Sequence, residues 1–259
     1  MTCKGNGKKV SVLSPHYDDT VFSLGGFVSK YVDEFDWKII DVFGRQDYTL
    51  YSRFYESNKN RNFAFHEEKV AMAIMGLESF EHWDIEEALL RGAYSGYGFL
   101  QTTAQPEEIV QAEIDCYNHL CNQMRSSQNL NECEIILCPL CIGHHVDHVL
   151  VRQACIQLYF GKKVIVFYEE LPYALGYSPE LVSKWLNGFL GEQLKQNSVE
   201  ISQYALQKKY LARIYQSQIR AATVESMISH GMHEGQYYEH LWTSKSYENN
   251  LFLTRRDDE

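Results

Sequence analysis

Short apolar runs alternate along the chain with stretches in which apolar residues recur at helical spacing. Runs rich in β-branched residues predict buried strands at residues 9–14, 37–43, 135–138 and 163–168. Helical spacing predicts helices at residues 20–31, 65–75, 106–124 and 149–158. Short strands that alternate with helices are typical of an α/β fold, with a mostly parallel sheet and helices on both faces.

The remaining segments show no sustained period. Residues 44–62 and 85–99 are polar or glycine-rich with many aromatic side chains, and we expect long loops there. The region from about residue 178 is expected to be mostly helical and aromatic-rich. Because neither an internal repeat nor a clear linker occurs, we expect residues 1–259 to form a single domain.

Composition and charge narrow the class of partner. The 259 residues carry a formal net charge of −10, which disfavours nucleic acid and anionic membrane surfaces and leaves a small molecule as the expected partner. The sequence has no apolar stretch of the roughly 18 residues that a membrane span needs, and its start lacks the apolar core of a secretory signal. Seven cysteines at irregular spacing indicate reduced thiols, so we expect a cytoplasmic protein.

Two polar clusters follow predicted strands. The first reads Pro15-His16-Tyr17-Asp18-Asp19 and the second reads His145-Val146-Asp147-His148. In parallel sheets, ligands bind beyond the carboxyl ends of the strands, where both clusters are expected to lie. Imidazole and carboxylate are ordinary zinc ligands, and a catalytic zinc site needs three of them plus an open position. His16, Asp19 and His148 would complete such a set, although another divalent metal is possible.

The other polar residues of the clusters suit hydrolytic chemistry. Asp18 lies between two of the candidate ligands in sequence, where its carboxylate can accept a proton from water and return it to a leaving amine. His145, when protonated, can stabilise the oxyanion of a tetrahedral intermediate. Asp147 can fix the tautomer of a nearby imidazole. The clusters together therefore predict a metal-dependent hydrolase.

Each cluster also has an ordinary structural interpretation. His-x-x-Asp alone is more often a helix-capping turn, and His-x-x-His alone is common on surfaces. Both patterns at strand ends, about 130 residues apart, favour a shared site. The C-x-x-C sequence of Cys138 to Cys141 admits a redox role, but packing and turn geometry explain it better because buried free cysteine behaves as a small hydrophobe.

The two clusters resemble the signatures of the PIG-L/LmbE-type zinc de-N-acetylases, whose motifs read (A/S)-H-P-D-D-E and H-P-D-H. Glu68, Ala71 and Met75-Gly76 are similar to the family's E-x-x-A-x-x-x-L-G helix. The segment 167–173 and the stretch ending Tyr-Gln-Ser-Gln at residue 218 are also similar, so the resemblance spans most of the chain.

The resemblance implies a Rossmann-like α/β fold and the same roles as the chemistry suggested. His16, Asp19 and His148 would bind zinc, Asp18 would be the general base and acid, and His145 would stabilise the oxyanion, oriented by Asp147.

Three departures concern recognition. Tyr17 and Thr20 stand where the family usually has Pro and Glu, and Phe65 stands where it often has Arg, a role that Arg53 or Arg61 would have to fill. Possible substrate contacts are His66, Glu67, Glu169, Glu170, Tyr173 and the aromatic loops at 48–55 and 94–99.

Three functions follow. The first is removal of acetyl from an N-acetylated amino sugar or glycoside. The second is an amidase that cleaves a larger acyl group from an amino sugar or natural product. The third, from another class, is a non-catalytic carbohydrate-binding protein on the same fold, which the retained ligand set disfavours. A nucleotide-binding protein is less favoured because no phosphate-binding motif occurs.

Overall fold

The apolar runs of the sequence form the central strands of the computed structural model, which describes residues 7–50, 57–77, 80–92, 105–186 and 194–244. The strands within these ranges are β1 (Lys9–Ser14), β2 (Asp36–Asp41), β3 (Glu81–His82), β4 (Ile135–Pro139), β5 (Val164–Tyr168), β6 (Leu194–Glu200), β7 (Met232–His233) and β8 (Gln236–Ser244). Strand β4 is buried along its whole length, as its continuous apolar sequence predicts.

The strands form one mixed sheet in the order β3-β2-β1-β4-β5-β8-β6, and β7 pairs with β8 outside this path. The first five are parallel, and β8 and β6 are antiparallel additions at one edge. From β1 the chain adds β2 and β3 on one side, and it then returns to place β4 and β5 on the other side of β1. This reversal is the topological switch point at which α/β sheets bind ligands.

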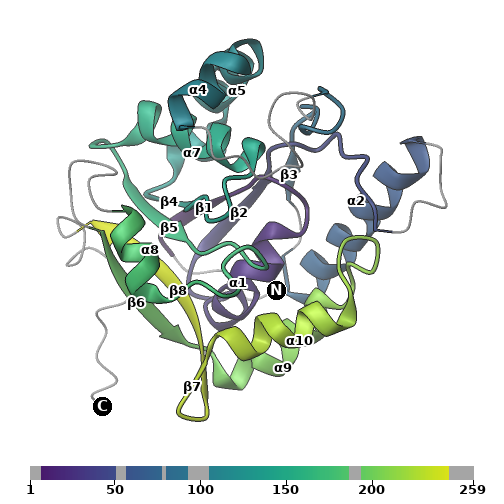
Figure 1. The fold of residues 1–259 in the computed structure, drawn as a ribbon, viewed down its shortest axis with the longest axis vertical. Helices are drawn as coiled ribbons and strands as arrows, with labels where there is room; N and C mark the ends of the chain where they lie inside the picture. Colours follow the sequence, from purple (N-terminus) through teal and green to yellow (C-terminus); the bar gives the residue numbers. More distant parts are fainter. Residues whose placement is uncertain (1–6, 51–56, 78–79, 93–104, 187–193, 245–259) are drawn as a thin grey trace.

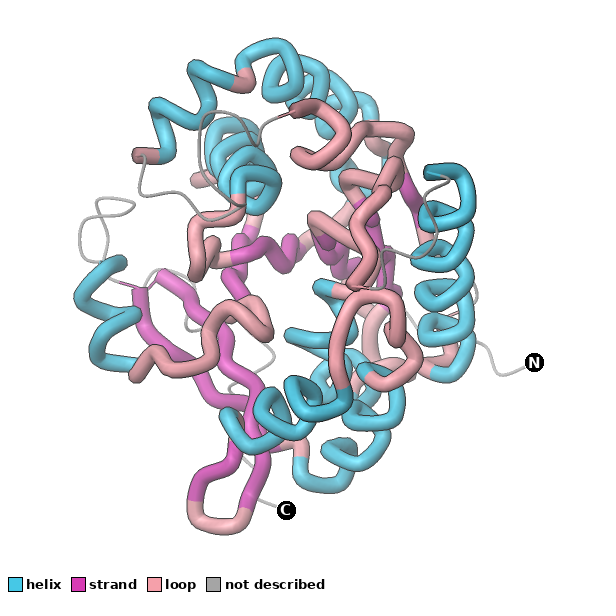
Figure 2. Tube along the Cα trace, turned by 45° about the vertical axis from the view of Figure 1, so that its right-hand side comes forward, coloured by secondary structure: helices cyan, strands magenta, loops and turns pink. Residues whose placement is uncertain are grey.

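Helices cover both faces of the sheet (Figures 1 and 2). In the described ranges they are α1 (Asp19–Lys30), α2 (Ser57–Ile74), α4 (Pro106–Ala112), α5 (Ile114–Ser126), α6 (Gln128–Glu132), α7 (Val146–Tyr159), α8 (Pro179–Leu186), α9 (Ala205–Ala212) and α10 (Ala221–His230), with a short 3-10 turn at Ser202–Tyr204. Figure 1 shows α1, α9 and α10 together on one side of the sheet and α4, α5 and α7 on the other. The α/β fold predicted from the apolar pattern is confirmed.

Two expectations need correction. The region after residue 178 contains β6, β7 and β8 as well as helices, because polar strands such as Leu-Lys-Gln-Asn-Ser-Val-Glu pair at the sheet edge without a continuous apolar run. The helix expected over 106–124 is divided in two at Glu113, whose backbone leaves the helical region at φ −108° and ψ 30°. Within the described ranges, no helix combines the length and apolar character needed to cross a bilayer.

Candidate active site

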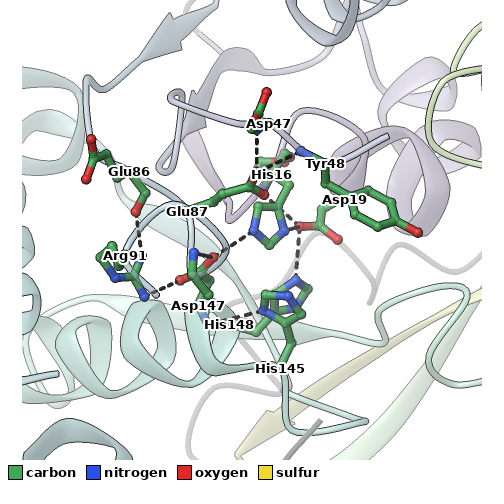
Figure 3. A network of polar contacts seen from close by, with 12 residues as sticks. His16, Asp19, Asp47, Tyr48, Glu86, Glu87, Arg91, His145, Asp147 and His148 are labelled. Atoms are coloured by element: carbon green, nitrogen blue, oxygen red, sulfur yellow. Dashed lines mark hydrogen bonds and ion pairs between the residues drawn. The ribbon is translucent and has the colours of Figure 1, made fainter. Parts of the chain in front are cut away.

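The two polar clusters meet at the switch point of the sheet. His16, Asp18 and Asp19 lie between β1 and the first turn of α1, and His145, Asp147 and His148 lie where β4 leads into α7. Because β1 and β4 are parallel neighbours, the two strand-to-helix connections open on the same edge. Figure 3 shows the side chains of both clusters pointing toward one another.

His16, Asp19 and His148, the predicted ligands, are in contact. Oδ2 of Asp19 lies 3.4 Å from Nδ1 of His16 and 3.2 Å from Nε2 of His148. Tetrahedral zinc with bonds near 2.1 Å separates its ligand atoms by about 3.4 Å, so these distances suit two ligand pairs on one ion. The imidazoles of His16, His145 and His148 also offer nitrogens that all lie within 4.8 Å of one another. His16 and His148 belong to both groupings.

His148 shows most directly that the donors fit a metal. Its Nδ1 lies 3.0 Å from Oε1 of Glu170, so in the neutral ring Nδ1–H donates to that carboxylate and the lone pair is on Nε2. Nε2 is buried and faces Oδ2 of Asp19 at 3.2 Å without a well-aligned hydrogen bond. Burial lowers the pKa of His148, but the charges of Asp19 and Glu170 outweigh it and raise the pKa to about 9. The surroundings therefore favour a positive charge at this point, and a zinc ion would supply it.

The carboxylate of Asp147 contacts His16. Its Oδ2 accepts hydrogen bonds from Nε2 of His16 at 3.0 Å and from the Ala88 N–H at 2.9 Å, and its Oδ1 accepts one from Arg91 at 2.7 Å. Burial raises the pKa of Asp147, but Arg91 and then His16 outweigh it and hold the pKa well below its usual range. The resemblance implied that this carboxylate orients His145. In the structure its described hydrogen bonds are with His16, Ala88 and Arg91 instead.

His145 instead receives a backbone hydrogen bond. Its Nδ1 accepts from the N–H of Asp147 at 3.2 Å, so the proton of the neutral ring lies on Nε2. Burial and then the charges of His16 and His148 lower the pKa of His145 well below its ordinary value. His145 is therefore suited to donate from Nε2–H as a neutral group, whereas the sequence argument expected a protonated ring.

Asp18 lines a cavity of about 350 Å³, together with His16, Asp19 and His145. Burial, followed by the charge of Asp19, raises the pKa of Asp18 to about 7. A carboxylate with a pKa near neutrality is matched to both accepting and returning a proton. Of the predicted catalytic residues, Asp18 and His145 thus line the cavity, and Asp147 stands behind His16.

The sequence analysis did not identify several residues that line this cavity. Gln46, Glu87 and Gln218 line it, and no lysine or arginine occurs among its described lining residues. Glu87 is fixed because its Oε1 accepts hydrogen bonds from the backbone N–H groups of Asp47 and Tyr48. These residues come from loop segments without periodicity, so the sequence held no signal for them. Tyr48 and Tyr173, which the sequence suggested, do line the cavity.

Other suggested contacts lie elsewhere. Glu170 supports His148, and Glu169 accepts hydrogen bonds from Gln196 and Trp242. Glu67 accepts from the backbone and hydroxyl of Ser217. His66 is exposed on α2. Residues 51–56 and 94–99, and with them Arg53, fall outside the described residues, as does the side chain of Arg61.

The three departures from the family pattern are absent from the described cavity lining, and two of them, Tyr17 and Thr20, are buried. The hydroxyl of Tyr17 donates to the carbonyl of Gly44 at 2.9 Å, and its ring packs near Phe65 and His82. Thr20 is fully buried at the start of α1. Cys138 and Cys141 are fully buried free thiols, and burial raises the pKa of both well above its ordinary value, which supports the packing interpretation.

Comparison with known proteins finds similar proteins that are named as deacetylases. No family model matches the chain. The 2'-N-acetylparomamine deacetylase of Streptomyces fradiae is 26% identical over 226 residues, which cover 85% of this chain and 76% of the relative. A deacetylase of the teicoplanin biosynthesis pathway, solved in complex with teicoplanin, has a TM-score of 0.68 at 18% identity and covers 90% of this chain and 97% of its own.

A third relative is the N,N'-diacetylchitobiose deacetylase of Pyrococcus horikoshii, with a TM-score of 0.58 at 14% identity over 93% of this chain and 86% of its own. The chain has the fold of these deacetylases. The resemblance to the PIG-L/LmbE-type enzymes that the motifs indicated is confirmed. Because one deacetylase fold can carry different substrates, what this deacetylase-like chain acts on depends on its own site residues.

Proposed function

We propose that the chain is a zinc-dependent deacetylase that hydrolyses the acetamide of an N-acetylated amino sugar or glycoside. One observation carries the proposal. Oδ2 of Asp19 lies 3.2 Å from the buried Nε2 of His148 and 3.4 Å from Nδ1 of His16, and Asp18, Asp19 and His16 line one cavity. That arrangement supplies metal ligands and a proton acceptor at one point of the switch-point crevice.

His16, Asp19 and His148 would hold the zinc ion, which when bound lowers the pKa of water and polarises a carbonyl. The chain's own groups do the rest. Asp18 accepts a proton from the attacking water while the water oxygen forms a bond to the acetyl carbon. The Nε2–H of His145 donates to the carbonyl oxygen as negative charge develops there. Asp18 then delivers the proton to the leaving nitrogen, so that the C–N bond breaks to give acetate and a free amine.

The amino-sugar substrate is supported by the cavity and by the relatives. The described lining combines hydrogen-bonding groups such as Gln46, Glu87 and Gln218 with the aromatic ring of Tyr48, a mixture suited to a hydroxylated ring. The absence of lysine and arginine from that lining favours a neutral or cationic substrate. The Streptomyces fradiae relative is named as a deacetylase of 2'-N-acetylparomamine, an N-acetylated compound. The buried free cysteines support a reducing, cytoplasmic location.

An acetate-release screen over N-acetyl amino sugars with zinc-loaded protein tests the proposal. We expect release that depends on added zinc and is lost in Asp18→Ala. A zinc-loaded protein that releases no acetate from any member, or an Asp18→Ala variant as active as wild type, would refute it. A second arm uses one amino sugar with acyl chains of increasing length. Faster release of long chains would favour the amidase function over deacetylation.

A further inference from the structure

Arg91 is a buried cation placed outside the cavity and outside the motifs. Only 12% of its side chain is exposed. Its guanidinium donates in three directions, to Oδ1 of Asp147 at 2.7 Å, to Oε2 of Glu113 at 2.9 Å and to the carbonyl of Glu86. The group also lies over the ring of Phe43, 5.0 Å from its centroid. Figure 3 shows Arg91 behind Asp147, on the side away from His16.

Asp147 connects this cation to the predicted metal centre. The carboxylate is completely buried, and its Oδ2 accepts from Nε2 of His16 at 3.0 Å. The hydrogen bonds from Arg91 at 2.7 Å and from the Ala88 N–H at 2.9 Å hold this carboxylate in one position. Because Oδ2 is fixed beside Nε2 of His16, the N–H of the neutral ring is directed to Asp147, and Nδ1, 3.4 Å from Asp19, is left for a metal.

We propose that Arg91 is a positioning residue for the metal centre, acting through Asp147 to fix the ring orientation and tautomer of His16. The inference rests on the proposed function only in taking His16 as a metal ligand. The guanidinium of Arg91 is not part of the described cavity lining, and its described hydrogen bonds go to Asp147, Glu113 and Glu86 rather than to Asp19 or His148.

The geometry explains why the position suits arginine. Three acceptors surround a planar guanidinium, and one of them, Glu113, belongs to the break between α4 and α5. A lysine ammonium could reach Asp147 but could not hold the same three partners in one plane. Phe43 adds a flat surface beneath the guanidinium, and its ring centroid is 6.1 Å from that of His16. Arg91→Lys should therefore restore part of what Arg91→Gln loses.

The test is zinc affinity, measured by competition between purified metal-free protein and a chromophoric chelator. Loss of a group that orients a metal-binding histidine typically costs about 10–100-fold in affinity, and we expect a weakening of that size for Arg91→Gln and a smaller one for Arg91→Lys. Arg45→Gln is the matched control, because Arg45 pairs with Glu86 at 2.9 Å but not with Asp147. It should bind zinc as wild type does. The visible spectrum of the cobalt-substituted proteins should change for Arg91→Gln and not for Arg45→Gln.

A double variant separates positioning from general stabilisation. If Arg91 acts through Asp147, Arg91→Gln in an Asp147→Asn background should weaken zinc binding no further. Independent, multiplying losses would overturn the proposal, as would wild-type zinc affinity in Arg91→Gln. Should Arg91→Gln fail to fold, Glu113→Gln loosens the arginine without removing it. A several-fold weaker zinc affinity in that variant supports the proposal, and an unchanged affinity refutes it.

None of these measurements uses acetate release. Wild-type protein that binds zinc in an Arg91-dependent way and releases no acetate would refute the proposed function and support the role of Arg91. If wild-type protein releases acetate and Arg91→Gln binds zinc as tightly as wild type, the proposed function is supported and the role of Arg91 is refuted.

Discussion

Nδ1 of His148 donates to Oε1 of Glu170 over 3.0 Å, and both side chains are completely buried. Glu170 is itself fixed, because its oxygens accept from the backbone N–H groups of Cys141 at 2.6 Å and Ile142 at 3.3 Å. His148 is therefore oriented by a carboxylate from the segment that follows β5, as His16 is oriented by Asp147. The two predicted metal-binding histidines use opposite ring nitrogens toward Asp19, Nδ1 in His16 and Nε2 in His148.

Glu170→Gln should weaken zinc binding by about 10–100-fold, because the amide keeps the shape of the side chain and removes the charge that holds Nδ1–H. Chelator competition measures the change. Glu169→Gln provides the control, since that neighbouring carboxylate faces Trp242 and Gln196. Equal zinc affinities in the Glu170 variant and wild type would show that the hydrogen bond does not aim His148.

Asp18→Asn should lower the rate of acetate release by about 10²–10⁴-fold, the usual contribution of a positioned proton acceptor. Zinc affinity should stay within a few-fold of wild type, because the contacts among Asp19, His16 and His148 do not involve Asp18. Metal content and single-turnover acetate release on the same sample give both values. A variant that loses zinc in proportion to activity would place Asp18 among the ligands instead.

The sequence was sufficient for the part of the site that is local. Strand β4 is a continuous apolar run and β1 carries three apolar residues, so the pattern placed His16 and His148 just after two strands of a parallel sheet. That the two strands are neighbours is seen in the structure. The supporting residues are not local. Arg91 reaches Asp147 across 56 positions, and Asp147 reaches His16 across 131. Arg91 comes from a turn without periodicity, and nothing in its neighbours marks it.

The correction for Asp147 has the same origin. Asp147 lies two positions after His145, and the resemblance paired the two. The first turn of α7 instead gives His145 the backbone N–H of Asp147 and directs the carboxylate to the neighbouring strand end. Strands β6 and β8 were missed. β6, at the edge of the sheet, has no apolar run of its own, and β8 is held by pairing with β5 and β6.

Tyr17→Phe should lower the free energy of unfolding by about 1 kcal/mol, because it removes a buried hydrogen bond to the carbonyl of Gly44. The Michaelis constant should not change, since Tyr17 does not line the cavity. Urea unfolding and steady-state acetate release measure the two effects. Tyr48→Ala, which alters a lining residue, should show the opposite pattern. A raised Michaelis constant in Tyr17→Phe would give this departure from the family motif a role in recognition.

Asp41 and Glu68 should make the metal-free protein less stable as pH rises. Both are completely buried, and both oxygens of Asp41 and Oε1 of Glu68 have no hydrogen-bond partner. Burial first, then the charge of Asp19, raises the pKa of Asp41 well above 3.8, and burial and Asp41 likewise raise that of Glu68 above 4.5. The folded state thus binds more protons than the unfolded state, so stability present at low pH is lost as pH rises from the unfolded values through the raised ones.

Asp41→Asn removes one of these groups, so its free energy of unfolding should fall less steeply with pH than that of wild type. The variant should gain stability relative to wild type as pH rises above the ordinary Asp pKa of 3.8 toward the raised pKa of Asp41. Urea unfolding of chelator-treated protein at several pH values measures the difference. Asp36→Asn, at an exposed position of the same strand, should run parallel to wild type. Parallel curves for Asp41→Asn as well would mean that Asp41 keeps its charge when folded, and a cation would then have to balance it.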